Sequence, residues 1–506
     1  MTMLASCDLN LTPTTSIVYE EGKPLFLQKT DVAAFQNGVL SSYRSVQYGS
    51  FTQSTEVMCD GFNATIGFGN NYGSVHRADY AFTPADQYVE SMWGSHYTAI
   101  KNYNIAIDNA DLVAEDASFK ADANLLKGIA LFARASSYIT LARHFGPVYN
   151  AATATTDLCV PLVLHYDQLA KPVRATMDEV YTQIIDDLDA AEELLQAAAD
   201  AGITPVIENK RINLAGTVRS PLPTVDAVKA LKARAYLDIK DYDQAASYAE
   251  EVLSSQAGYL LATTNDEMTA EYINDQGTEP IVQLYASQTE GAKSNTLYTS
   301  VTNTEDAGKV FGSLYVPTKK LVNAYSKSDL RFTNWFTNSL YPVRQAGSLY
   351  EGAYIFVKYL DNPALRTGDV ETGAHKAKPL LISEMYLIAA EAYAMLGQDG
   401  DATQVLNALK TARKAGAVTG DIMDEIKQEW FKETVGEGHR LTCIKRWGEG
   451  LEERVPQDEA DAFVQKGAAF NERVLEAGSH VFVWPVPSYE LKINENLVQN
   501  PGYGVN

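Results

Sequence analysis

The chain has 506 residues, of which 46% are hydrophobic and 21% are charged, as in an ordinary soluble globular protein. Its formal net charge of −23 disfavours nucleic acid as a partner, because the phosphate backbone would be repelled. No apolar run approaches the roughly 20 residues that a helix needs to span a bilayer. Cys7, Cys59, Cys159 and Cys443 fit no metal motif and no CxxC redox pair, so we expect neither a bound metal nor a cofactor.

The first residues of the chain resemble the end of a bacterial lipoprotein signal. Residues 4–7 read LASC, which is similar to a lipobox, where small residues precede a cysteine that becomes lipidated. Only six residues precede Cys7, and none is Lys or Arg, so a complete signal peptide is missing from this sequence. We expect residues 1–7 to be the remnant of that signal, Cys7 to carry the lipid, and residues 13–16 to belong to a tether. The alternative is that Cys7 is an incidental cysteine.

Three long segments, 48–80, 258–318 and 336–378, show no helical period and are rich in Gly, Asn, Thr and Tyr. Loops of this length are usually functional or disordered, and their aromatic content argues against disorder. Within the first, residues 67–73 read GFGNNYG, which follows GxGxxxG rather than a phosphate-binding GxGxxG and lacks the strand–helix context. We interpret it as a flexible loop that presents Phe68 and Tyr72.

The helical segments are spread along the chain. Residues 124–143 have apolar residues at helical spacing and end before HFGP, and residues 177–195 carry an apolar stripe opposite acidic residues. Residues 235–253 match the tetratricopeptide pattern, with Ala245 as the small residue of the second helix, and residues 392–409 match it again with Ala402. Such repeats need neighbours to bury their faces, so the sequence predicts a mostly α, tetratricopeptide-like scaffold of about four helix pairs, with long loops and small β insertions.

Two further segments lie near the C-terminus. Residues 422–448 predict an amphipathic helix that breaks at Gly436 and a second short helix through Trp447. Here Arg440 and Arg446 are better explained as partners of Glu429, Glu433 or Glu437 than as an anion site. Residues 481–503 read VFVWPVPSYELKINENLVQNPGY, which predicts a short strand stopped by prolines, then a turn and an ordered tail.

The string W-P-x-P … N-x-x-L-x-Q-N-P-G-Y in this tail closely resembles the C-terminus of the SusD/RagB family, the cell-surface nutrient-binding lipoproteins of Bacteroidetes. The E-x-x-G-E-G-x-R … K-R-W-G stretch, the embedded repeats and the lipobox resemble the same family. The resemblance implies one SusD-like domain over residues 8–506, with halves 8–256 and 257–506 packed together. It also implies an outer-membrane lipoprotein that hands a glycan to a SusC-like TonB-dependent transporter without cleaving it.

Sugar rings stack their C–H faces on aromatic planes, and their hydroxyls need polar partners. The aromatic and polar loops therefore supply the candidate ligand-binding residues: Phe68, Asn70, Asn71 and Tyr72 in the first loop, and Tyr285 and Tyr298 in the second. Neither loop contains Trp, which weakens an assignment to starch.

Three other interpretations remain open. A peptide-capturing relative would replace stacking by backbone pairing and a deeper pocket. A plain tetratricopeptide scaffold would have only a protein partner, although it would not need three long Tyr- and Asn-rich insertions. A glycosidase needs two acids that meet in space, and no segment singles out such a pair, so we do not expect an enzyme.

Overall fold

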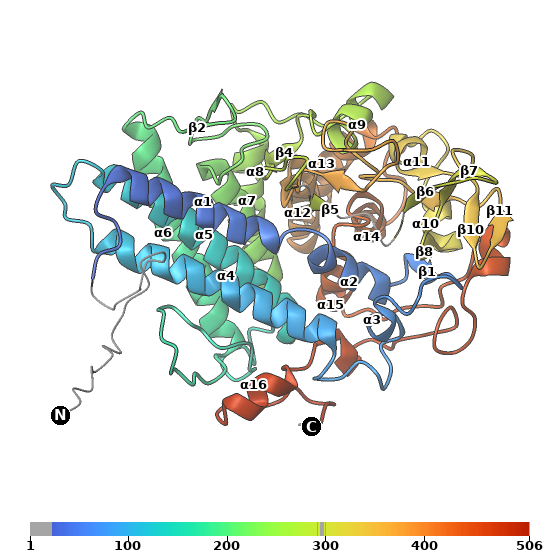
Figure 1. The fold of residues 1–506 in the computed structure, drawn as a ribbon, viewed down its shortest axis with the longest axis horizontal. Helices are drawn as coiled ribbons and strands as arrows, with labels where there is room; N and C mark the ends of the chain where they lie inside the picture. Colours follow the sequence, from blue (N-terminus) through green and yellow to red (C-terminus); the bar gives the residue numbers. More distant parts are fainter. Residues whose placement is uncertain (1–22, 291, 294–297, 299, 505–506) are drawn as a thin grey trace, which may run out of the picture.

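The computed structural model describes residues 23–290, 292–293, 298 and 300–504, and the side chains of all of these except 292 and 293. Helices form most of the left and centre of the molecule in Figure 1, and short strands gather at the right. The α-helices are α1 (Lys29–Ser45), α2 (Ser50–Met58), α3 (Gly73–Arg77), α4 (Gln87–Asp111), α5 (Lys120–Phe145), α6 (Met177–Asp200), α7 (Val225–Asp238), α8 (Tyr242–Leu253), α9 (Asn265–Tyr272), α10 (Lys319–Asn323), α11 (Leu330–Trp335), α12 (Ile382–Met395), α13 (Asp399–Ala412), α14 (Ile422–Glu433), α15 (Arg440–Trp447) and α16 (Ser488–Ile493). Two 3₁₀ helices are η1 (Asp458–Phe463) and η2 (His480–Phe482).

The strands are β1 (Phe62–Ala64), β2 (Val206–Ile207), β3 (Lys210–Arg211), β4 (Pro280–Val282), β5 (Ala292–Lys293), β6 (Val301–Thr304), β7 (Gly308–Phe311), β8 (Tyr315–Pro317), β9 (Phe336–Thr337), β10 (Val343–Gln345), β11 (Ser348–Tyr350), β12 (Ile355–Phe356), β13 (Ala374–His375) and β14 (Leu380–Leu381). One described sheet has four strands in the order β11-β10-β7-β6, and the others are two-stranded ladders: β1-β8, β12-β9, β13-β5, β14-β4 and β2-β3. These small sheets confirm the predicted β insertions in a mostly helical chain.

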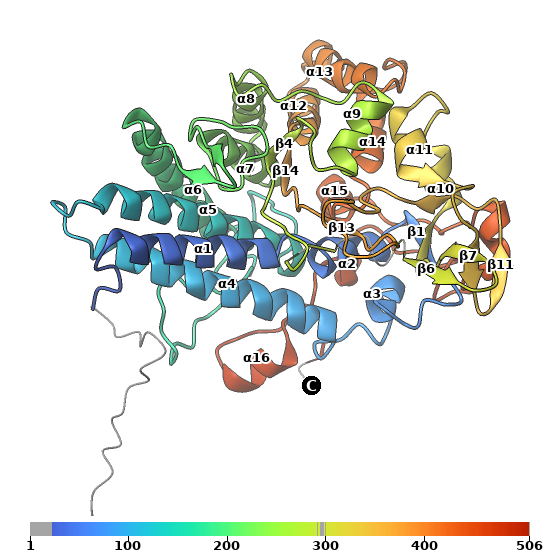
Figure 2. The same cartoon turned by 45° about the horizontal axis from the view of Figure 1, so that its top comes forward.

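The helices pack against one another in the series α4, α5, α6, α7, α8, α12 and α13 (Figure 2). Both tetratricopeptide copies are confirmed as helix pairs, α7 with α8 and α12 with α13. Ala245 and Ala249 of α8 are fully buried, so their small side chains let the neighbouring helices approach closely. Tyr236 and Tyr248 fill the remaining space as parallel rings with centroids 5.6 Å apart.

The predicted helix over residues 124–143 is α5, and it ends at Phe145 with Gly146 as its C-cap. Among the described helices, α5 is long and apolar enough to cross a membrane by length and composition alone. However, 89% of its most apolar window is buried inside the protein, so we interpret it as the central core helix. The predicted amphipathic helix over residues 177–195 is α6, whose Thr176 and Glu179 form a capping box.

The prediction that residues 48–80 and 258–318 have no helix was wrong, because α2 and α3 lie within the first segment and α9 lies within the second. The sequence of α2, SFTQSTEVM, shows no apolar stripe because polar side chains that include Gln53, Ser54 and Glu56 are buried along with Val57. The same analysis did not predict α1 or α4.

The strand predicted at residues 481–483 was also wrong. Residues His480–Phe482 form η2, and helix α16 follows the prolines. The chain bends here because Trp484 docks on the end of α5: its backbone N–H donates to His144 O at 2.7 Å, and its ring meets the His144 ring edge-to-face at 4.9 Å. The predicted ordered tail is otherwise confirmed, with α16 and the chain end lying below α4 in Figures 1 and 2.

The largest hydrophobic core contains residues from Phe26 to Leu497, so it draws on nearly the whole described chain. Cys59, Cys159 and Cys443 are buried in this core and are unpaired. Cys7 and the expected tether lie outside the described residues.

Candidate functional site

Of the six residues predicted to contact a ligand, Tyr285 lies in an open groove. The groove has a volume of about 450 Å³ and runs between the second half of α1, the β2–β3 hairpin and the chain from Leu284 to Glu290. In Figure 1 the hairpin lies above α1. The residues that line it are Asn37, Leu40, Ser41, Arg44, Ile207, Glu208, Pro221, Leu284, Tyr285 and Glu290.

Arg44 fixes the position of Tyr285 from α1. Its Nη1 donates to Tyr285 O at 2.9 Å, its Nη2 donates to Glu290 Oε2 at 3.0 Å, and the guanidinium lies 5.8 Å from the centre of the Tyr285 ring. The Tyr285 side chain is still 40% exposed, so much of the ring is accessible to a ligand. The groove therefore combines an accessible aromatic ring with amide, hydroxyl, guanidinium and carboxylate groups.

The opposite wall is the β2–β3 hairpin. Glu208 and Asn209 form its two-residue turn with φ values of +51° and +62°, which is the backbone of a type I′ hairpin turn. Lys376 forms an ion pair with Glu208 at 3.2 Å and ties the hairpin to the chain beside β13. The wall is therefore anchored at its tip.

Tyr298 lines a different hollow, the central cleft, which has a volume of about 120 Å³. This cleft lies between the ends of α1, α2 and α5 on one side and the chain around β13, β14 and the α14–α15 connection on the other. The Tyr298 ring is buried, stacked on Phe62 with centroids 4.3 Å apart, and its Oη has no hydrogen-bond partner among the described residues.

Charged side chains dominate the wall of the central cleft. Its ion pairs are Arg143 with Asp238 (2.8 Å), Arg234 with Glu384 (2.6 Å), Lys358 with Glu437 (2.9 Å) and Lys378 with Asp275 (2.6 Å). Burial lowers the pKa of His144 and of His375 to about 4 and that of His439 to about 3, so these three imidazoles are neutral near pH 7.

The loop from Phe68 to Tyr72 lines neither hollow. Phe68 is buried edge-on against Tyr315 and Phe470, so the expectation that this loop presents the Phe68 ring was wrong. Tyr72 is half-buried, and its ring stacks on the Tyr88 ring with centroids 3.9 Å apart. The backbone N–H of Tyr72 also donates to Tyr88 Oη, which holds the two residues together.

Asn70 and Asn71 are exposed on the same loop. Asn70 Oδ1 accepts from Arg77 Nη1 at 2.9 Å, and Asn71 Nδ2 donates to Phe68 O at 2.9 Å. The structure therefore places these two amides on the surface, apart from the groove that contains Tyr285.

Arg440 and Arg446 are structural, as predicted, but their predicted partners were wrong. Arg440 forms an ion pair with Asp60 at 2.8 Å, and Arg446 forms one with Glu391 at 2.7 Å. The reason is that Glu429 and Glu433 point into a separate buried network.

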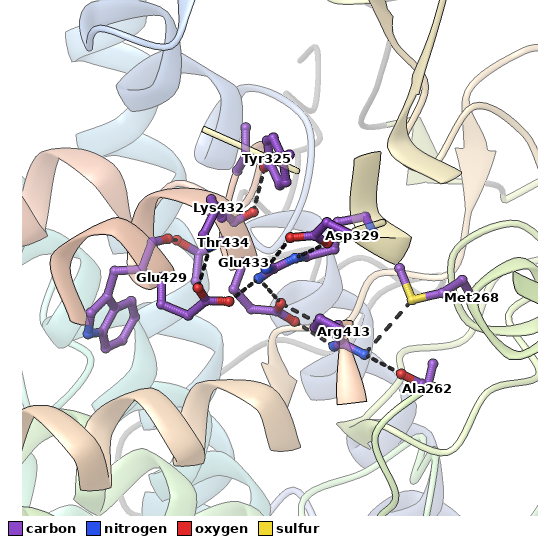
Figure 3. A network of polar contacts seen from close by, with 12 residues as sticks. Ala262, Met268, Tyr325, Asp329, Arg413, Glu429, Lys432, Glu433 and Thr434 are labelled. Carbon is purple, nitrogen blue, oxygen red and sulfur yellow. Dashed lines mark hydrogen bonds and ion pairs between the residues drawn. The ribbon is translucent and has the colours of Figure 1, made fainter. Parts of the chain in front are cut away.

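That network joins α11, α13 and α14 (Figure 3). Glu433 bridges two arginines, accepting from Arg413 at 2.5 Å and from Arg331 at 2.9 Å. Arg331 also binds Asp329, and Arg413 also binds Glu279, both at 2.7 Å. All of these side chains are almost fully buried and mutually compensated, so the network is a structural clamp rather than a binding site.

In the described part of the chain, no group of three or more His, Cys, Asp or Glu residues is arranged to hold a metal ion. The residue that sequence reasoning missed is Arg44, since α1 was not predicted as a helix. The sequence gives little indication of the role of Arg44, because a single arginine at a helix end has many possible partners.

Comparison with known proteins assigns the architecture. The model of the SusD family matches residues 233–503, which is more than half of the chain, and a second model, described as starch-binding associating with outer membrane, matches residues 19–210. The chain belongs to the SusD family. The description of the second model also supports an association with the outer membrane. A comparison with curated proteins gives no match.

Solved structures share the fold at low sequence identity. A SusD superfamily protein from Bacteroides thetaiotaomicron is 22% identical with a TM-score of 0.74, over 93% of this chain and 99% of its own. A SusD superfamily protein from Bacteroides vulgatus is 22% identical with a TM-score of 0.72, over 95% of this chain and 100% of its own. A laminarin-binding SusD-like protein is 21% identical with a TM-score of 0.70, over 94% of this chain and 100% of its own.

Proposed function

We propose that this protein binds an oligosaccharide at the cell surface through the groove around Tyr285 and delivers it to a SusC-like TonB-dependent transporter for import. The observation that carries the proposal is the partly exposed Tyr285 ring, held by Arg44 in a groove of about 450 Å³ beside the polar side chains of Asn37 and Ser41. A pyranose stacks its C–H face on such a ring while the amide and hydroxyl groups bind its hydroxyls.

Family membership supports the rest of the proposal. The transporter partner and import are inferred from the SusD family alone, and the lipid anchor on Cys7 is inferred from the LASC sequence and lies outside the described residues. We infer that the protein binds without cleaving, because a SusD-like protein that shares its fold is described as laminarin-binding.

The other predicted residues receive different roles in this proposal. Asn70 and Asn71, which are exposed, stay candidates for contact with a distant part of a long glycan. Phe68 and Tyr72 shape that loop through their ring contacts, and Tyr298 belongs to the central cleft.

The test is isothermal titration calorimetry of the protein lacking residues 1–7. Neutral and acidic polysaccharides, including starch and laminarin, and a peptide digest are titrated in turn. We expect saturable binding to one glycan class, weakened about 10-fold in Tyr285→Ala, because loss of a stacked ring costs about 1–1.5 kcal/mol. Tyr80→Ala is the matched control, since Tyr80 is 92% exposed and lines neither the groove nor the central cleft.

Each alternative has its own outcome in this experiment. Binding of peptides and of no glycan would favour the peptide-capturing interpretation. Release of shorter sugars from the bound glycan would show an enzyme. Equal affinity of Tyr285→Ala and the unmodified protein for the glycan would remove the groove from the proposal.

A further inference from the structure

A further open pocket borders the β2–β3 hairpin, and we call it the hairpin pocket. It is lined by the chain from Lys210 to Arg219, by Asp226 of α7 and by residues 255–257 after α8. Its volume is about 600 Å³, within the roughly 300–1,000 Å³ range of small-molecule sites. The hairpin pocket is therefore large enough to hold a sugar unit.

Two cations that line the hairpin pocket are held by backbone carbonyls. Lys210 Nζ donates to Val218 O and, at 3.3 Å, to Arg219 O. Arg219 Nη1 donates to Gln276 O and, at 2.7 Å, to Gly277 O. Neither cation forms an ion pair with an Asp or Glu in the part of the chain that the structure describes. The carbonyls thus fix both side chains but leave their positive charges without a counter-charge.

The uncompensated charges of Lys210 and Arg219 act on each other. Burial lowers the pKa of Lys210, and the neighbouring cations Arg219 and Lys376 lower it further. Lys376 has a counter-charge in Glu208 at 3.2 Å, whereas Arg219 has none among the described side chains. An anion bound beside Lys210 and Arg219 would reduce their repulsion. Because the whole chain has a net charge of −23, two such cations in one pocket are a local feature.

The carboxylate of Asp226 also lines the hairpin pocket, but it is engaged within the wall. Its Oδ2 accepts a hydrogen bond from Ser255 Oγ, and burial raises its pKa, which favours the neutral acid. A Cβ atom on Gly216 would lie 1.9 Å from the same oxygen, so the Gly216 backbone lies directly against it. Asp226 therefore does not neutralise Lys210 or Arg219.

The rest of the lining is polar and pre-formed. The Asn213 backbone N–H donates to Thr217 Oγ1, and Thr217 Oγ1 donates to Asn213 O, both at 2.9 Å. The described residues that line the hairpin pocket include no aromatic ring, unlike the groove with Tyr285. A pocket with cations, amides and no stacking surface suits an oxyanion substituent better than the C–H face of a neutral sugar ring.

We propose that the hairpin pocket is a second binding site, which takes an oxyanion substituent of a glycan, a carboxylate or a sulfate, held by Lys210 and Arg219. This inference rests on the proposed function in assuming a saccharide ligand, and it narrows the ligand to glycans with acidic substituents. The two sites are neighbours, since Ile207 lines the groove and its cross-strand partner Lys210 lines the hairpin pocket. One glycan can therefore stack a ring on Tyr285 and place an acidic unit in the hairpin pocket.

The test is calorimetric titration of the full chain at low salt with glucuronate, glucose 6-sulfate, glucose and inorganic sulfate as separate probes. We expect at least one of the two anionic sugars to bind 10-fold or more tightly than glucose, and the tighter of the two identifies the oxyanion. Lys210→Gln and Arg219→Gln should each weaken this binding about 10-fold, because each removes a charge-assisted hydrogen bond. Lys210→Arg keeps the charge and should retain most of the affinity.

Arg211→Gln is the matched control. Arg211 follows Lys210 in β3, is exposed and does not line the hairpin pocket, so its loss changes the net charge equally and should leave anionic sugar binding unchanged.

Three results would overturn the proposal. The first is equal affinity for glucose and for both anionic sugars. The second is an equal effect of Lys210→Gln, Arg219→Gln and Arg211→Gln, including no effect of any, because the pocket would then play no part. The third is binding of inorganic sulfate as tight as that of the anionic sugars, which would show a general anion site. Tyr285→Ala separates the two proposals: it should weaken oligosaccharide binding and leave binding of the single anionic sugars unchanged, so either site can fail without the other.

Discussion

Arg440 forms a two-point ion pair with Asp60, which lies 380 positions earlier in the chain. Its Nε donates to Oδ1 at 2.9 Å, and its Nη2 donates to Oδ2 at 2.8 Å. Beside this pair, the Gly438 backbone N–H donates to Glu56 Oε1 at 2.9 Å. The GEGHR segment therefore holds the end of α2 with two interactions, which joins the N-terminal and C-terminal parts of the chain and gives this motif a structural role.

Arg440→Ala should lower the free energy of unfolding by about 3 kcal/mol, because it leaves the buried Asp60 carboxylate with Lys320 as its one remaining cation among the described residues. Urea denaturation measures the change. Lys466→Ala is the control, because Lys466 and Asp461 are both more than half exposed and their ion pair should contribute less than about 0.5 kcal/mol. Equal losses in the two variants would contradict the structural role of Arg440.

Glu56 should make stability depend on pH. Burial raises its pKa from 4.5 to about 7, and the hydrogen bond from Gly438 opposes this in part. The folded state favours the protonated carboxyl of Glu56. Its contribution to the free energy of unfolding is therefore complete below the unfolded pKa of about 4.5 and is lost as the pH rises through about 7. The loss reaches about 3 kcal/mol.

Glu56→Gln, which mimics the protonated acid, should therefore gain stability relative to the unmodified protein between pH 5 and pH 8. Urea denaturation at these two pH values gives the difference between the proteins. The difference is the useful quantity because buried histidines such as His375, with a pKa lowered to about 4, change stability in the opposite direction as the pH falls from 6.5. A difference that is the same at both pH values would show that Glu56 does not titrate there.

Removal of an arginine from the network around Glu433 should strongly lower the free energy of unfolding. Arg413→Met removes the cation that binds both Glu279 and Glu433 and leaves two buried carboxylates without full compensation. We expect a loss of about 3–5 kcal/mol in thermal or urea unfolding. Lys319→Met, which removes an exposed partner of Asp458, is the matched control with an expected change below about 0.5 kcal/mol.

Local sequence pattern predicted those parts of the fold in which burial follows one face of a helix. Residues 177–195 were predicted because Val180, Ile184 and Leu188 repeat at helical spacing, and the structure buries all three. Helix α2 could not be predicted this way, because its buried face includes the polar residues Gln53 and Glu56, and Glu56 accepts its hydrogen bond from Gly438, far away in the sequence.

The candidate site was predicted less completely for the same physical reason. An aromatic residue in a Tyr- and Asn-rich loop either faces solvent or packs on the core, and distant contacts decide which. Tyr285 remains accessible beside Arg44, whereas Tyr298 stacks on Phe62 and Phe68 packs on Phe470. Arg440 was likewise expected to pair with nearby acids, but its partner was far away in sequence.

Asn500 should provide much of the interaction that attaches the NPGY tail to the core. Its Nδ2 donates to Phe145 O at 2.9 Å and to Trp484 O at 2.7 Å, and its Oδ1 accepts from Arg174 Nη2 at 2.7 Å. One side chain thus satisfies the end of α5, the W-P-x-P segment and a buried arginine together.

Asn500→Ala should cost about 2–4 kcal/mol in urea denaturation, because three hydrogen bonds are lost and the Trp484 carbonyl is left without a partner among the described residues. Asn496→Ala, four residues earlier, loses one hydrogen bond from Nδ2 to Lys171 O at the surface and should cost less than about 1 kcal/mol. Digestion with a carboxypeptidase should also shorten Asn500→Ala faster than Asn496→Ala, since the freed tail exposes its backbone. Equal stability and equal digestion of the two variants would mean that the tail is held by the Trp484 ring and not by Asn500, and Trp484→Phe would then be the variant that releases it.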